Sequence, residues 1–149
     1  VERSRGLGDV YKRQYLYAQL EVADKINDRR LAIWDKYYEG LKELKDEGKI
    51  ELQVIPEGCK HNAHMFFMKA KDLQERTELI KYLKENEIQT VFHYIPLHTA
   101  PAGIKYGRFH GEDRYTTKES ERLMRLPMHY ALTDEDVECV IEKIKEFYK

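Results

Sequence analysis

The sequence predicts an α+β domain in which helices pack on a small, mostly antiparallel sheet. Three observations lead to this prediction. Apolar residues recur at helical spacing from Tyr15 to about Glu47, short apolar runs typical of strands follow, and the last residues form another amphipathic helix. The expected order is therefore long helix, strand, strand, helix, strand, short helices and helix.

The first predicted element is one long helix over residues 15–47. Gly48 supplies a stop, and apolar residues recur at helical spacing: Leu16, Leu20, Ala23, Leu31, Trp34, Tyr38 and Leu41. About 33 helical residues span about 50 Å, whereas a domain of this size has a diameter of about 40 Å. We therefore expect either a bend near residues 28–30 or a first half that packs on something outside this domain, and we favour the second.

Residues 1–14 do not continue this helical pattern. They combine four basic and two acidic residues with two glycines and show no usable apolar periodicity. We expect a non-native or disordered stub here and assign it no function.

Three strands and a helix are predicted for the middle of the chain. The strands are expected at residues 50–55, 63–70 and 88–92, and the second is apolar enough to be central. Between the second and third strands, Asp72 with Glu75 predicts an N-capping pair for a helix that ends near Asn86.

Two further helices are predicted after a polar loop. Thr116 with Glu119 indicates a capping box for a short helix, and residues 126–128 read as a short extended piece. Thr133, followed by three acidic residues, starts the last helix, whose apolar face would be Val137, Val140, Ile141, Ile144 and Phe147. Cys139 lies among these residues, and we expect it to be a buried structural thiol.

The segment most suggestive of a ligand site is residues 92–98, with the sequence FHYIPLH. It follows an apolar run and holds two imidazoles, a phenol and a proline. Imidazole is easily poised near neutral pH, and loops after strands often carry function. If the strand alternation continues, Phe92 and Tyr94 share one face and His93 lies on the other. The alternative is that these side chains only finish the strand.

Other groupings of polar residues are weaker. Cys59, His61 and His64 are ligand types that zinc accepts, but no fourth ligand stands at a familiar spacing, so we predict no metal site. One polar loop could contact a phosphate or carboxylate, although a solvated loop with local ion pairs is favoured: Arg108, His110, Asp113, Arg114 and Lys118. No lysine sits in an apolar context suited to Schiff-base chemistry, so no catalytic residue is expected in this chain.

The composition limits the partners of the protein. Charged residues make up 36% of the chain but leave a net charge of −1, which argues against nucleic-acid or membrane binding through bulk electrostatics. No apolar run reaches the roughly 18 residues of a membrane span, and we expect no signal peptide. Two distant cysteines without a CxxC motif suggest reduced thiols and a cytoplasmic protein.

Five blocks of the sequence carry a resemblance to one enzyme family. In order from about Tyr15, they are YLYAQLEVADKINDRR, NAHMFF, VFHYIPLH, GEDRYTTKESERLMRLPM and LTDEDVECVIEKI. The chain resembles the C-terminal part of the sugar-nucleotide aminotransferases of the DegT/DnrJ/EryC1/StrS type. The resemblance implies the small domain of a fold-type I transferase (residues 48–149), preceded by an interdomain helix (residues 15–47), with the large cofactor domain outside this chain.

The resemblance also implies a reaction and its participants. An amino group would move from glutamate to the 4-keto carbon of a dTDP-linked sugar, with pyridoxal 5'-phosphate as cofactor and a homodimer as the assembly. His93, Tyr94 and His98 would be substrate-binding residues, whereas the aldimine lysine would lie in the large domain. The chain alone is then expected to be inactive and to bind no cofactor covalently. The alternative is a free-standing α+β interaction module that uses the long helix.

Overall fold

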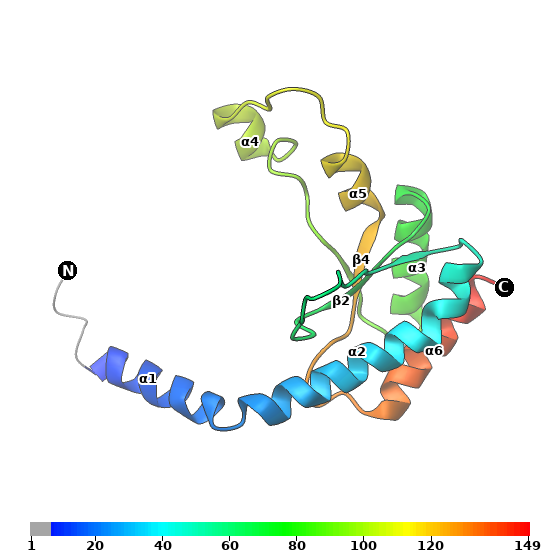
Figure 1. Ribbon diagram of the computed structural model, residues 1–149. Coiled ribbons are helices and arrows are strands. Elements are labelled where there is room, and N and C mark those ends of the chain that lie inside the picture. Colours follow the sequence, from blue (N-terminus) through cyan, green and yellow to red (C-terminus); the bar gives the residue numbers. More distant parts are fainter. Residues whose placement is uncertain (1–6) are drawn as a thin grey trace.

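The computed structural model of this chain describes residues 7–149 (Figure 1). Its elements are α1 (Leu7–Leu20), α2 (Ala23–Asp46), β1 (Glu51–Leu52), β2 (Phe66–Lys69), α3 (Leu73–Glu85), β3 (Val91–Phe92), α4 (Pro101–Tyr106), α5 (Thr116–Arg122), β4 (Leu123–Leu126) and α6 (Asp134–Phe147). Helices around a small sheet confirm the predicted α+β class. None of the described helices combines the length and apolar character needed to cross a membrane.

The strands form one sheet with the order β1-β2-β4-β3, in which each neighbouring pair is antiparallel. The prediction that residues 63–70 hold a central strand is confirmed, because β2 lies between β1 and β4. β4 was not predicted: extended structure was expected only at residues 126–128, whereas the strand begins at Leu123. The reason is that β4 follows α5 without an intervening turn residue, so its start carries no local signal.

Helices α2, α3 and α6 cover one face of the sheet, and the hydrophobic core lies between them. Phe66 and Met68 of β2 and Met124 of β4 are fully buried there, and Phe66 packs against the rings of Trp34 and Tyr37 of α2. We call the opposite side of the sheet the open face; its side chains are half-buried or exposed, and they are Phe67, Lys69, Val91, Leu123 and Arg125.

The long helix is broken, contrary to the prediction of one helix over residues 15–47. α1 starts at Leu7, inside the segment expected to be a stub, and a turn at Glu21 and Val22 separates it from α2. Residues 1–6 of that segment lie outside the described residues. α1 extends away from the body of the domain (Figure 1), and its side chains from Tyr11 to Leu20 include many large apolar groups that are more than half exposed.

Polar anchors explain why the helix does not bend at residues 28–30, where we considered a bend. Arg29 donates hydrogen bonds to Asp134 Oδ1, at 2.7 Å, and to the Leu132 carbonyl oxygen. Arg30 donates to the carbonyl oxygen of Ala63 at 3.1 Å. These contacts hold this part of α2 against the domain, so the break falls upstream, where the chain leaves the body.

The predicted starts of α3 and α6 are confirmed. The Asp72 side chain accepts a hydrogen bond from the Glu75 amide at 2.9 Å. At α6, Thr133 and Asp136 form a reciprocal capping box. Both caps satisfy amide groups that have no partner within the helix.

The predicted capping box of Thr116 and Glu119 is wrong. Asp113, from the preceding loop, accepts from the Thr117 amide at 3.3 Å, and no side chain caps the helix from the N-cap position. Glu119 instead accepts a hydrogen bond from Lys69 Nζ at 2.6 Å, which ties α5 to the central strand. A contact distant in sequence thus replaces the local one.

Cys139 is exposed, which corrects the expectation of a buried thiol. The buried stripe of α6 runs through Val137, Val140, Ile141 and Ile144. Because each helical residue turns by about 100°, Cys139 lies about 200° from Val137 and faces away from the stripe. Apolar neighbours in sequence therefore did not place this side chain in the core.

Replacing Tyr37 with phenylalanine should stabilise the domain by about 1 kcal/mol. The Tyr37 side chain is fully buried, and its hydroxyl has no hydrogen-bond partner in the part of the chain that the structure describes. Burial also raises the pKa of this phenol. Equilibrium urea unfolding of both proteins measures the difference. A loss of stability instead would mean that the hydroxyl has a partner in solution.

Candidate functional site

The predicted ligand segment leaves the sheet at the end of β3 and enters a protruding arm. We define the arm as residues 95–115, which carry α4 and stand apart from the sheet and its helices (Figure 1). Large apolar side chains of the arm are exposed, among them Ile95, Leu97, Ile104, Tyr106 and Tyr115. The site therefore lies where the open face of the sheet meets the base of this arm.

The rings of His93 and Tyr94 pack against each other at this point. Their ring centroids lie 3.8 Å apart, and the peptide bond between them is cis. The predicted alternation is wrong here: Tyr94 lies with His93, whereas Phe92 packs against the guanidinium of Arg76, 5.2 Å from its ring centroid. The structure thus brings together two of the three predicted site residues.

The surroundings of the His93 imidazole favour its neutral form. Burial lowers its pKa first, and the positive charge of Arg125 lowers it further. Its Nδ1 atom is buried and has no hydrogen-bond partner among the described residues. A neutral imidazole has one N–H donor and one acceptor nitrogen, so the ring can still bond a ligand through the nitrogen that is not buried.

His98, the third predicted site residue, holds the base of the arm together. Its Nε2 lies 2.7 Å from Asp113 Oδ2, and its ring packs against Phe109 with centroids 4.4 Å apart. Thr117 also donates its hydroxyl to Asp113. We call His98, Asp113 and Thr117 the clasp. The imidazole is thus engaged within the chain, and its contact with substrate stays a prediction.

Replacing Asp113 with asparagine should loosen the arm, because it removes the carboxylate of the clasp. Hydrogen bonds from Thr117 and then from His98 lower the pKa of Asp113 in the folded protein. A lowered folded-state pKa stabilises the fold above the ordinary carboxyl range, and this contribution is lost as the pH falls through the lowered value. We therefore expect faster tryptic cleavage of D113N at Lys105 and Arg108 at neutral pH.

The neighbouring Glu112→Gln variant is the control for that experiment. Glu112 pairs only with Arg114 among the described residues, and both side chains are largely exposed. Exposed pairs contribute little, so cleavage of E112Q should match the unsubstituted protein. Equal cleavage of D113N and E112Q would contradict the clasp.

Arg125 is the site residue that the sequence analysis missed. It lies on β4 opposite Phe67 of β2 and Val91 of β3, on the open face. Its guanidinium carbon lies 5.8 Å from the centroid of the Tyr94 ring. In the sequence LMRL, the charged Arg125 stands between two apolar residues. This alternation is typical of a strand with one exposed face. The signal was missed because β4 itself was not predicted.

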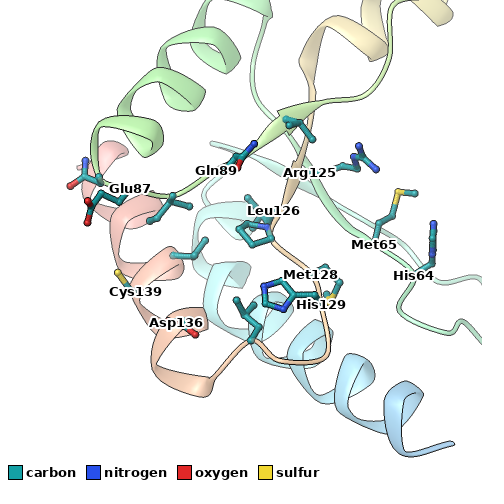
Figure 2. A pocket seen from close by; sticks show the side chains of 16 residues that line it. His64, Met65, Glu87, Gln89, Arg125, Leu126, Met128, His129, Asp136 and Cys139 are labelled. Atoms are coloured by element: carbon teal, nitrogen blue, oxygen red, sulfur yellow. The ribbon is translucent and has the colours of Figure 1, made fainter. Parts of the chain in front are cut away.

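A groove of about 760 Å³ begins beside Arg125 and runs to α6. Figure 2 shows Arg125, Met65 and His64 at one end and Glu87, Asp136 and Cys139 at the other. The groove is therefore basic at the end near the His93–Tyr94 pair and acidic at the far end.

The zinc interpretation of Cys59, His61 and His64 finds no support. Within residues 7–149, no group of three or more His, Cys, Asp or Glu side chains is placed to hold a metal ion. His61 packs on the ring of Trp34 with centroids 4.5 Å apart, and its Nδ1 accepts from the Ala63 amide at 3.3 Å. These contacts occupy it in local packing.

Four of the described lysines have side-chain partners that do not suit a covalent site for pyridoxal phosphate. An aldimine lysine needs a lowered pKa, yet each resolved shift of a lysine pKa is upward, caused first by a hydrogen-bonded side-chain partner: Lys36 by Glu138, Lys45 by Tyr38, Lys69 by Glu119 and Lys143 by Glu146. We therefore derive no step through this cofactor from the chain.

Fold and site together define an α+β domain whose open face carries Arg125 beside the His93–Tyr94 pair. Solved structures share this fold. The aminotransferase TlmJ from Streptoalloteichus hindustanus matches with a TM-score of 0.77 and 25% identity, over 89% of this chain and 34% of that one. A putative sugar aminotransferase from Streptococcus pneumoniae, Spr1654 in its PMP form, matches with a TM-score of 0.72 and 25% identity, over 88% and 33%.

Residues 14–145 match the DegT/DnrJ/EryC1/StrS aminotransferase family, and the chain belongs to this family. A dTDP-3-amino-3,4,6-trideoxy-alpha-D-glucose transaminase from Micromonospora megalomicea subsp. nigra is 28% identical over 93% of this chain and 37% of the relative. A pleiotropic regulatory protein from Geobacillus stearothermophilus is 33% identical over 71% of this chain and 29% of the relative. The chain thus spans about a third of the length of such relatives, and the family prediction is confirmed.

Proposed function

We propose that this chain is the C-terminal portion of a pyridoxal-phosphate-dependent aminotransferase. The whole enzyme would move an amino group from glutamate to the 4-keto carbon of dTDP-4-keto-6-deoxy-glucose and give dTDP-4-amino-4,6-dideoxygalactose. The family match over residues 14–145 carries the proposal. The narrower block GEDRYTTKESERL, which resembles this particular transaminase, supports the choice of substrate. The enzyme would act as a cytoplasmic homodimer.

In this proposal the chain supplies substrate contacts and no proton-transfer group. His93 and Tyr94 would bind sugar hydroxyls or the diphosphate, and His98 would reach the substrate from the base of the arm. The open position of the His93–Tyr94 pair supports this role, because Tyr94 is 64% exposed. Cofactor binding and the aldimine lysine would belong to the rest of the enzyme.

An assay of the longer protein that contains this segment tests the proposal. With pyridoxal phosphate, glutamate and dTDP-4-keto-6-deoxy-glucose, we expect an amine at carbon 4 with the galacto configuration, identified by NMR of the product. This chain by itself should form no aldimine absorbance with the cofactor and should turn over no sugar. An amine at carbon 3, or a catalytically active fragment, would contradict the proposal.

A protein-interaction module is the second candidate function, and the exposed apolar side chains of α1 favour it. Tyr15, Leu16 and Leu20 are each more than half exposed. A stable free-standing protein would cover such an apolar surface with a partner. The isolated chain distinguishes the two candidates. Cooperative unfolding of a monodisperse species would favour the module, whereas self-association through α1 would favour a segment of a larger enzyme.

A further inference from the structure

We propose that Arg125 and His93 form an oxyanion-binding subsite, which receives a carboxylate or phosphate group of a ligand on the open face. The inference deepens the proposed function and rests on it for the candidate anions, a carboxylate of the amino donor or a phosphate of the nucleotide. Arg125 lies outside the segment that contains the His93–Tyr94 pair. Its position on β4 brings it to this site.

The register of the sheet puts Arg125 next to the strand that leads into His93. Arg125 of β4 lies directly opposite Val91 of β3. His93 directly follows Phe92, the last residue of β3, and so lies close to this position. The lowering of the His93 pKa by the charge of Arg125 agrees with this proximity. Tyr94 lies between them: its ring packs against that of His93 at a tilt of 31°, and the Arg125 guanidinium carbon lies over it, 5.8 Å from the ring centroid.

Arg125 has no acidic partner in the part of the chain that the structure describes. Its Nε is buried and makes no hydrogen bond. Other half-buried arginines are engaged: Arg122 binds Glu51, Glu119 and the Ala70 carbonyl oxygen, and Arg29 binds Asp134. Arg76 also has a buried, unbonded Nε, but Glu121 lies near its charge. Arg125 is therefore a half-buried cation without an acidic partner among the described residues.

The surroundings of Arg125 are suited to an anion. A guanidinium offers a planar fork of N–H donors that matches a carboxylate or phosphate in two parallel hydrogen bonds. The imidazole of His93 adds a further hydrogen-bond donor. His64 lies at the same end of the groove, whereas Glu87 and Asp136 lie at the other (Figure 2). An anion at Arg125 would thus lie near hydrogen-bond donors and far from the carboxylates that line the other end of the groove.

NMR of the His93 ring in the 149-residue chain tests the subsite without cofactor or turnover. We titrate the chain with inorganic phosphate, glutamate and dTDP separately, at constant ionic strength, and follow the His93 Cε1–Hε1 signal, assigned with a His93→Gln variant. We expect a saturable shift with phosphate and with at least one organic anion. Arg125→Met should weaken this binding about tenfold or more, because it removes both charge-assisted hydrogen bonds.

Two further variants make the result specific. Arg125→Lys keeps the charge but loses the fork, so it should bind more weakly than the unsubstituted chain and more tightly than R125M. Arg114→Met is the matched control, because Arg114 is a largely exposed arginine paired with Glu112; its affinities should be unchanged. If R125M fails to fold, as judged by its unfolding transition, the comparison of R125K with the unsubstituted chain carries the test.

The outcomes separate the ligand sources and the two proposals. Saturation by glutamate alone assigns the subsite to the donor carboxylate, and saturation by dTDP alone assigns it to the nucleotide diphosphate. The subsite is disproved if no anion gives a saturable shift, or if the Arg125 variants bind as the unsubstituted chain does. Failure of the proposed transamination shows in the assay of the longer protein and leaves this binding readout unaffected.

Discussion

Replacing Phe66 with alanine should destabilise the domain by about 3–5 kcal/mol. Phe66 is fully buried on the central strand β2, opposite Leu126 of β4. Its ring lies 5.6 Å from that of Trp34 and 5.2 Å from that of Tyr37, measured between centroids. Truncation removes the aromatic contacts that join the sheet to α2 and leaves a cavity that the short strands cannot close without losing register.

Chemical denaturation followed by Trp34 fluorescence measures this loss. The control is Phe109→Ala, which truncates the same residue type where the side chain is 45% exposed, in the arm. Its effect should be about 1 kcal/mol or less. Similar losses for the two variants would mean that the sheet–helix interface is not the main source of stability.

Replacing Gly103 with alanine should displace α4 while leaving the rest of the domain folded. A Cβ at this position would lie 1.6 Å from the carbonyl oxygen of Leu97 and 2.7 Å from its carbonyl carbon. Both atoms belong to the backbone, so no side-chain rotation can relieve the overlap. α4 packs close to the start of the arm only because residue 103 has no side chain, and the helix must move away or unfold in the variant.

Amide hydrogen exchange resolves this local effect. The amides of Ile104 and Gly107, which bond to the carbonyl oxygens of Ala100 and Gly103, should lose protection. The amides of β2 and β4 should keep theirs, because the arm makes no part of the core. Ala102→Ser, a change at an exposed site on the same turn, serves as control. Retained protection at Ile104 in G103A would contradict the close approach.

Much of the fold follows from local patterns in the sequence. The apolar face of α6 and the caps of α3 and α6 were predicted correctly, because helical periodicity and capping act within a few residues. The central position of β2 was predicted from its apolar character. These features needed no knowledge of distant partners.

The features that were missed depend on contacts distant in sequence. The break at Glu21 and Val22 falls where it does because Arg29 and Arg30 hold the following turns of α2 to the loops beside α6 and β2. The start of α5 is capped by Asp113, which His98 positions from the other side of the arm. No periodicity in the sequence signals either contact.

Part of the candidate site lies in the segment that the sequence analysis singled out. Residue types alone drew attention to His93 and Tyr94, because imidazole and phenol groups cluster there after a strand. Arg125 was missed because its position in the site depends on the register of β3 with β4, which places it opposite Val91. The engagement of His98 with Asp113, 15 residues away, likewise could not be read from the segment that contains it.

The clasp has a consequence for how this arm can vary in length. It pins the two ends of the arm at His98 and Asp113, so residues added between them enlarge a loop that is already closed. Each doubling of such a loop costs only about 0.6 kcal/mol of chain entropy. Gly111, with φ +81° and open space around it, is a point where insertion meets no packing. Insertions near Gly111 should therefore be tolerated, and they would change the reach of the arm without altering the sheet.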